Sequence, residues 1–154
     1  MILLIVCRPD APMKTFVRVF VEGTPKPQAQ VITSTRYGGK RRIVRTKAVR
    51  DWMEAIREKL AAINISRMEG PLHVKLSFFL CKPKYLPKKP TPKHPYVDWP
   101  VGRKHDLDNL AKVVLDACTG ILWNDDGQIV ELELSKGWAL DNPEGVEIEV
   151  TELE

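Results

Sequence analysis

The amino-acid sequence predicts a two-layer α+β domain, with a mixed sheet and two main helices in the order β-α-β-α-β-β. Two segments repeat apolar residues at helical spacing, and four others alternate apolar and polar residues as strands do. A chain of 154 residues is long enough to bury a core without disulfides. We expect a single domain over residues 13–154, preceded over residues 1–12 by a leader or an extra edge strand.

The first half of the chain predicts a strand and a helix with a basic segment between them. Residues 15–22 alternate β-branched and aromatic side chains and predict a strand, which the prolines that follow would end. Residues 28–45 are polar and basic, which fits either a long loop or a loose hairpin. Thr46 is a suitable N-cap for a helix that runs to about Ile63.

The second half predicts three strands, a helix and a long loop. Residues 72–80 alternate as a strand, and residues 129–138 and 146–153 alternate apolar and acidic residues as two more. The second helix is expected over residues 108–118. Residues 82–104 hold six prolines together with lysines and aromatic residues, and this composition predicts a long mobile loop within the domain.

Charge is divided unevenly along the chain. The net charge is only +4, but residues 26–50 carry eight basic side chains and no acid, whereas the stretch from Asp125 onward carries ten acids and one lysine. A cationic surface favours a polyanionic partner, of which nucleic acid is the commonest. The alternative is a set of solvated lysine-rich loops.

Cysteine usage and hydropathy favour a cytoplasmic protein. Cys7, Cys81 and Cys118 lack the spacing of metal ligands, so we expect buried free thiols in a reducing compartment. The apolar run at residues 1–7 is too short to cross a bilayer, and no membrane association is expected.

The most informative pattern is acidic. Asp106 and Asp108 stand at the start of the second predicted helix, Lys112 follows one turn later, and Asp125 and Asp126 come after the helix ends. Carboxylates that converge repel one another unless a cation lies between them, and oxygen ligands of this kind suit Mg²⁺. Metal-assisted phosphoryl chemistry is therefore the first hypothesis.

Each of these acids also has a structural explanation. An aspartate is a preferred helix N-cap, Asp108 and Lys112 could form an ordinary ion pair, and Asp125-Asp126 could belong to a turn. The pattern as a whole is hard to assign to capping alone. A calcium loop is excluded because Leu110 stands at a ligand position, and the three histidines lack the spacing of a zinc site.

These residues resemble the RusA family of Holliday junction resolvases. The resemblance is strong over residues 103–136 and looser at the Gly23-x-Pro25 turn. The matching residues are Asp106-Leu107-Asp108-Asn109-Leu110-x-Lys112, then Leu115-Asp116-Ala117, then Trp123-x-Asp125-Asp126-x-Gln128-Ile129.

The resemblance implies a RusA-like fold and a role for each acid. Asp106, Asp108 and Asp126 would be the catalytic carboxylates that bind Mg²⁺, for which Mn²⁺ is an expected substitute. Asp125 would assist them, and Lys112 would be an essential catalytic cation.

The implied activity is that of a magnesium-dependent endonuclease. A homodimer would resolve four-way DNA junctions by paired symmetric nicks, in DNA recombination and repair, and a prophage would be a typical source. We expect Lys26, Lys40, Arg41, Arg42, Arg103 and Lys104 to contact DNA. Tyr37, Tyr85, Tyr96 or Trp99 could stack on unpaired bases or serve only in packing. The alternatives are a non-catalytic nucleic-acid-binding module, an adaptor protein, and a nuclease that acts on forks or flaps.

Overall fold

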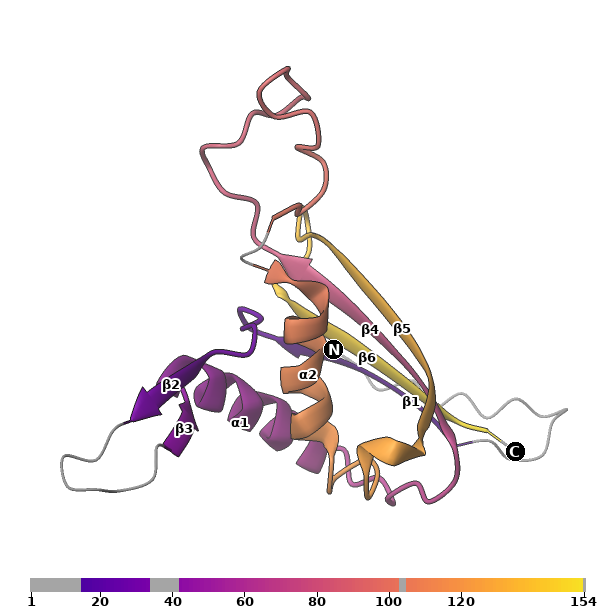
Figure 1. Ribbon diagram of the computed structural model, residues 1–154. Helices are drawn as coiled ribbons and strands as arrows, with labels where there is room; N and C mark the ends of the chain where they lie inside the picture. The colour runs from indigo at the N-terminus through magenta and orange to yellow at the C-terminus, as the bar shows by residue number, and fades with distance from the viewer. Residues whose placement is uncertain (1–14, 34–41, 103–104, 154) are drawn as a thin grey trace, which may run out of the picture.

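The computed structural model describes residues 15–33, 42–102 and 105–153, and for residues 30–33, 42 and 43 it describes the backbone alone. The elements, in chain order, are β1 (Phe16–Glu22), β2 (Gln30–Thr33), β3 (Arg42–Arg45), α1 (Lys47–Ala61), β4 (Leu72–Leu80), α2 (Leu107–Cys118), the short 3₁₀ helix η2 (Asp126–Gln128), β5 (Ile129–Trp138) and β6 (Gly145–Glu152) (Figure 1).

Four of these strands form one mixed sheet in the order β1-β6-β4-β5. β6 lies antiparallel to both β1 and β4, whereas β4 and β5 are parallel. A parallel pair cannot be joined by a tight turn, and the chain crosses from β4 to β5 through α2. The α+β fold class predicted from the sequence is confirmed.

Both helices pack on the same face of the sheet, and this layer contains the core (Figure 1). β4 buries every second side chain from Leu72 to Leu80, because successive residues of a strand point to opposite faces. Side chains such as Leu76 and Ile148 are fully buried, and each contributes about 1.5–3 kcal/mol to stability. The core fixes how α2 lies across the sheet.

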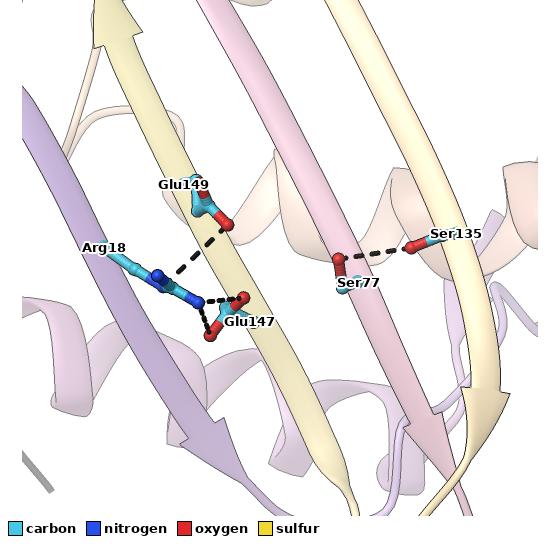
Figure 2. Close-up of polar contacts among 5 residues, drawn as sticks. All are labelled: Arg18, Ser77, Ser135, Glu147 and Glu149. Carbon is cyan, nitrogen blue, oxygen red and sulfur yellow. Dashed lines mark hydrogen bonds and ion pairs between the residues drawn. The ribbon is translucent and has the colours of Figure 1, made fainter.

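The other face of the sheet carries polar side chains (Figure 2). Arg18 on β1 pairs with Glu147 and Glu149 on β6, and these carboxylates raise the pKa of its guanidinium. Ser135 on β5 donates a hydrogen bond to Ser77 on β4 at 3.2 Å. In Figure 2 the helices lie behind the strands, so this open face is the one that no helix covers.

Helix α1 begins where the sequence predicts. The Thr46 hydroxyl accepts a hydrogen bond from the Val49 amide and so satisfies one of the free N–H groups of the first turn. Of the two alternatives for residues 28–45, the hairpin is the correct one, because β2 and β3 pair antiparallel. The hairpin residues 34–41 lie outside the described part of the chain.

The expectation of buried free thiols is confirmed for one cysteine and wrong for another. Cys118 is buried and free as predicted, but Cys81 is exposed, because it follows the last residue of β4, where the alternating burial ends. Cys7 and the expected leader at residues 1–12 lie outside the described residues. No helix in the described ranges is long and apolar enough to cross a membrane.

Candidate active site

Asp106 and Asp108 lie at the start of α2. Asp106 occupies the N-cap position, yet its side chain makes no capping hydrogen bond, and its backbone carbonyl accepts the Leu110 amide. Asp108 lies in the first turn, where the helix dipole favours a negative charge. Both side chains are exposed. Capping therefore does not use the Asp106 carboxylate, which is available for a ligand.

Lys112 lies one turn after Asp108 and is exposed. The four-residue spacing would allow an ion pair between the two side chains. Within the described ranges, however, Lys112 forms no ion pair. Its ammonium group is therefore available to an anion that approaches the start of α2.

Asp126 lies beyond the other end of α2, in η2. Its Oδ1 accepts a hydrogen bond from Trp123 Nε1 at 3.0 Å and another from the Thr119 hydroxyl. Trp123 is fully buried and Thr119 is the C-cap residue of α2. The indole and the hydroxyl together hold the Asp126 carboxylate against the C-terminal end of the helix.

Asp125 has a structural task. It is the N-cap of η2, and its side chain accepts the Gly127 amide at 2.7 Å. Gln128 completes a capping box, because its side-chain oxygen accepts the Asp125 amide, while its Nε2 donates to the carbonyls of Met68 and Gly70. The turn explanation therefore accounts for Asp125 but not for Asp126.

The two groups of carboxylates are separated by the length of α2. Asp108 and Thr119 are 11 residues apart along the chain, which corresponds to about 16 Å of helix, and Figure 1 shows the start of α2 and η2 at opposite ends. Among the described residues, no three or more His, Cys, Asp or Glu side chains are grouped to hold a metal ion. Asp106 and Asp108 offer the donors that Mg²⁺ prefers, but one chain does not bring Asp126 to them.

Three other segments contact α2, two of them near its acidic end. Lys136 on β5 donates to the His105 carbonyl at 2.7 Å, and the Gln28 amide donates to the Asn109 carbonyl at 3.0 Å. Farther along the helix, Arg45 at the end of β3 forms an ion pair with Asp116. The basic hairpin and the end of β5 are thereby attached to the helix that carries Asp106 and Asp108.

Sequence reasoning missed the supporting roles of Thr119, Arg45 and Lys136. Lys136 did give a signal, because it is the single base of the acidic C-terminal stretch and shares a strand face with Leu134 and Trp138. A cation at such a position needs a partner.

The predicted DNA-contacting residues are only partly described. Lys26 is half-buried, two residues before Gln28 and so close to the first turn of α2. The backbone of Arg42 belongs to β3, while its side chain is not described. The remaining predicted contacts, Lys40, Arg41, Arg103 and Lys104, lie outside the described residues.

A buried thiol lies behind Asp126. Burial raises the pKa of Cys118, the negative charge of Asp126 raises it further, and Arg57 acts in the opposite sense. Cys118 therefore stays protonated and unreactive near neutral pH.

The start of α2 thus presents exposed carboxylates and a lysine that forms no ion pair within the described residues. Oxygen ligands for a metal ion and a fixed positive charge are groups that hydrolysis of a phosphodiester can use. The family model for endodeoxyribonuclease RusA matches residues 22–151. The chain belongs to the RusA family, as its motifs predicted, and the family is one of endodeoxyribonucleases that resolve Holliday junctions in DNA recombination. No curated protein sequence matches the chain.

Proposed function

We propose that this protein is a Mg²⁺-dependent homodimeric resolvase that nicks two strands of a four-way junction symmetrically. Each active site would combine Asp106 and Asp108 of one subunit with Asp126 of the partner subunit. The observation that carries this proposal is the separation of the two acidic groups along α2 within one chain.

The direction of β5 supports a shared site. β5 begins directly after η2, next to Asp126, and near its other end Lys136 bonds to His105, the residue before Asp106. The strand therefore runs from one acidic group to the other. Two copies of β5 placed antiparallel, with a two-fold axis between Glu133 and Leu134, would bring the start of each strand beside the end of its neighbour.

The exposed edge of β5 supports the same arrangement. β5 is the last strand of the described sheet, so the backbone groups along its outer edge have no strand partner there. Val130 and Leu132 on this strand are 60% and 45% exposed, although Leu132 points to the face that the helices cover elsewhere. A second copy would bury these side chains and pair the edge through a self-complementary contact.

The residues of the chain would then have separate roles in phosphodiester hydrolysis. Mg²⁺ held by the three carboxylates would supply Lewis-acid assistance to phosphodiester hydrolysis. Lys112, on the same helical face as Asp108, would place a fixed positive charge beside the phosphate as its negative charge increases. Thr119 and Trp123 would hold Asp126 in one orientation, which limits reorganisation of the site during the reaction.

Substrate binding would rest on the basic segments around this site. The proline-lysine loop leads into the start of α2, and the basic hairpin is attached to α2 through Gln28, which bonds to Asn109, and through Arg45, which pairs with Asp116. Contacts of lysine and arginine side chains go mainly to phosphates and do not depend on sequence. A two-fold axis relating two sites would suit a junction with two equivalent strands.

Mixed dimers provide the test. A dimer of one Asp108→Asn chain and one Asp126→Asn chain retains one complete site if the sites are shared, and none if each site lies within one chain. With Mg²⁺, the purified heterodimer should nick a supercoiled cruciform plasmid without linearising it. Wild-type protein should linearise the plasmid, and both variant homodimers should leave it intact.

The controls separate the parts of the proposal. A heterodimer as inactive as the homodimers would exclude the shared site. If wild-type protein binds junctions but cuts none with Mg²⁺ or Mn²⁺, the chain is a binding module. If it cuts forks or flaps faster than junctions, forks or flaps are its substrate. Cleavage that persists in EDTA would exclude the metal.

A further inference from the structure

The segment between β4 and α2, which the sequence predicts to be mobile, is braced by hydrogen bonds, although it contains no helix or strand longer than a bridge within its described residues 81–102. Thr91 and His94 exchange two backbone hydrogen bonds of 3.2 and 3.0 Å, and the Trp99 amide donates to the Tyr96 carbonyl at 3.0 Å. Six prolines restrict the backbone further. The loop is also fixed to the sheet, because Trp138 Nε1 on β5 donates to the carbonyl of Val97, a buried residue, at 2.9 Å.

This braced loop encloses a cavity of about 460 Å³, which we call the loop pocket. Its lining includes Tyr85, Tyr96, Trp99, Trp138 and Lys93. Cavities of a few hundred Å³ with aromatic walls and few polar groups are typical binding sites for flat organic ligands. The volume is sufficient for a single heterocyclic base.

Three of the lining rings are exposed to an unusual degree. The exposed fractions of Tyr85, Tyr96 and Trp99 are 79%, 67% and 65%. Large aromatic side chains normally bury most of their area, and a group of exposed ones marks a binding surface. Because the loop is braced, the backbone that carries these rings loses little freedom when they meet a ligand.

The charge of the loop complements a polyanion. Between residues 82 and 102 there are five lysines and one aspartate, a net charge of +4. Lys84, Lys88, Lys89 and Lys93 are exposed. An apolar peptide would explain the rings but not this charge, whereas a nucleotide strand offers bases for the rings and phosphates for the lysines.

The loop pocket also lies next to the candidate active site. His105 contributes to its wall and directly precedes Asp106 in the chain. Figure 1 shows the loop extending beyond the end of the sheet at which α2 begins. A strand whose phosphate is held at Asp106 and Asp108 would therefore pass the mouth of the pocket.

We infer that the loop pocket binds a nucleobase unstacked from the junction, close to the phosphate that is cleaved. This inference rests on the proposed function. Stacking between the base and the exposed rings would hold the strand at the junction centre, where bases lack a full set of neighbours. The lysines of the loop would hold the flanking phosphates.

A base-deletion cycle tests this inference. Affinity is measured in EDTA, in an Asp108→Asn background, for one junction with intact central bases and one with abasic sites at the same positions. The abasic junction should bind about tenfold more weakly. Adding Trp99→Ala should weaken binding to the intact junction by a similar factor and remove the difference between the two junctions.

Two further variants serve as matched controls. Trp99→Phe keeps an aromatic face and should retain most of the difference between intact and abasic junctions. Leu140→Ala removes an equally exposed apolar side chain outside the loop and should change neither affinity. Circular dichroism and thermal unfolding should be unchanged in all three variants, since both positions are exposed.

An equal effect of abasic sites on every variant would overturn the inference. So would a change of oligomeric state in Trp99→Ala, because the rings would then contact a second copy. The readout needs no cleavage, so a failed cleavage test would overturn only the proposed activity. Cleavage without the base-dependent difference would overturn only the loop pocket's role.

Discussion

Asp106 and Asp125 are the N-cap residues of two different helices, α2 and η2. Asp125 caps η2 with its side chain, whereas the Asp106 carboxylate leaves the N-terminal amides of α2 without a side-chain cap. A residue that caps contributes about 1 kcal/mol to stability. The contrast separates an aspartate with a folding role from one whose side chain is free for a substrate or an ion.

Two substitutions should therefore affect the protein in opposite ways. Asp125→Ala should lower the free energy of unfolding by about 1 kcal/mol. Asp106→Asn should leave stability almost unchanged, abolish cleavage, and keep or tighten junction binding, because a negative charge near phosphates is lost. Urea unfolding and gel-shift titration measure both effects. Cleavage by Asp106→Asn at a near wild-type rate would remove this residue from the catalytic set.

Cys118 predicts a loss of stability at alkaline pH. Burial and then Asp126 raise its pKa above the ordinary value of 9.0, so the folded state holds the thiol proton more tightly than the unfolded state. Its contribution is complete below about pH 9 and is lost as pH rises beyond that value. The difference in unfolding free energy between wild type and Cys118→Ala should therefore be constant below about pH 9 and become smaller as pH rises above that value. A difference that stays constant above about pH 9 would contradict the raised pKa.

At the scale of elements, local patterns predicted most of the fold. Alternation in residues 72–80 and helical spacing after Thr46 gave those elements to within two residues, because each buries one face against the core. Residues 28–45 left two alternatives open, since a polar hairpin lacks an apolar face. The edge position of β5 could not be predicted: Leu132 alternates like a buried residue, and only the strand order makes it exposed.

The path of the chain between α2 and η2 explains why the distance from Asp126 to Asp106 and Asp108 could not be predicted. Asp126 lies seven residues after Thr119. An extended chain of that length spans about 24 Å, which is enough to reach back along α2. Instead, the Gly120 amide donates to the Trp123 carbonyl at 2.7 Å, and the indole of Trp123 is buried. The turn therefore keeps Asp126 at the end of the helix.

A substitution at the outer edge of β5 tests the proposed dimer interface. Leu132→Glu places a charge where the proposed dimer would bury an apolar side chain, and burial of an unpaired charge costs several kcal/mol. Dimerisation should weaken at least about tenfold in analytical ultracentrifugation, with the fold intact by circular dichroism and cleavage lost in parallel. Leu140→Glu, at another exposed leucine, is the control. A dimer that persists in Leu132→Glu would place the interface elsewhere.

For the whole molecule, the separation of charge along the chain predicts a salt-sensitive complex. The N-terminal basic stretch and the proline-lysine loop oppose an acidic C-terminal third. Junction affinity should fall by about 10³-fold or more between 50 and 200 mM salt if six or more phosphates are contacted. Fluorescence anisotropy titrations measure the slope. A flat response would exclude a cationic binding surface.

The open sheet face has a consequence for the order of events when DNA arrives. It carries five glutamates, Glu22, Glu131, Glu133, Glu147 and Glu149, against Arg18 and Lys75, a net charge of −3. A polyanion that approaches from that side is repelled, so the charge of this face acts on the approach of DNA before any contact forms. The glutamates of the open sheet face therefore steer association electrostatically, because they disfavour encounters in which this side of the nuclease meets the junction.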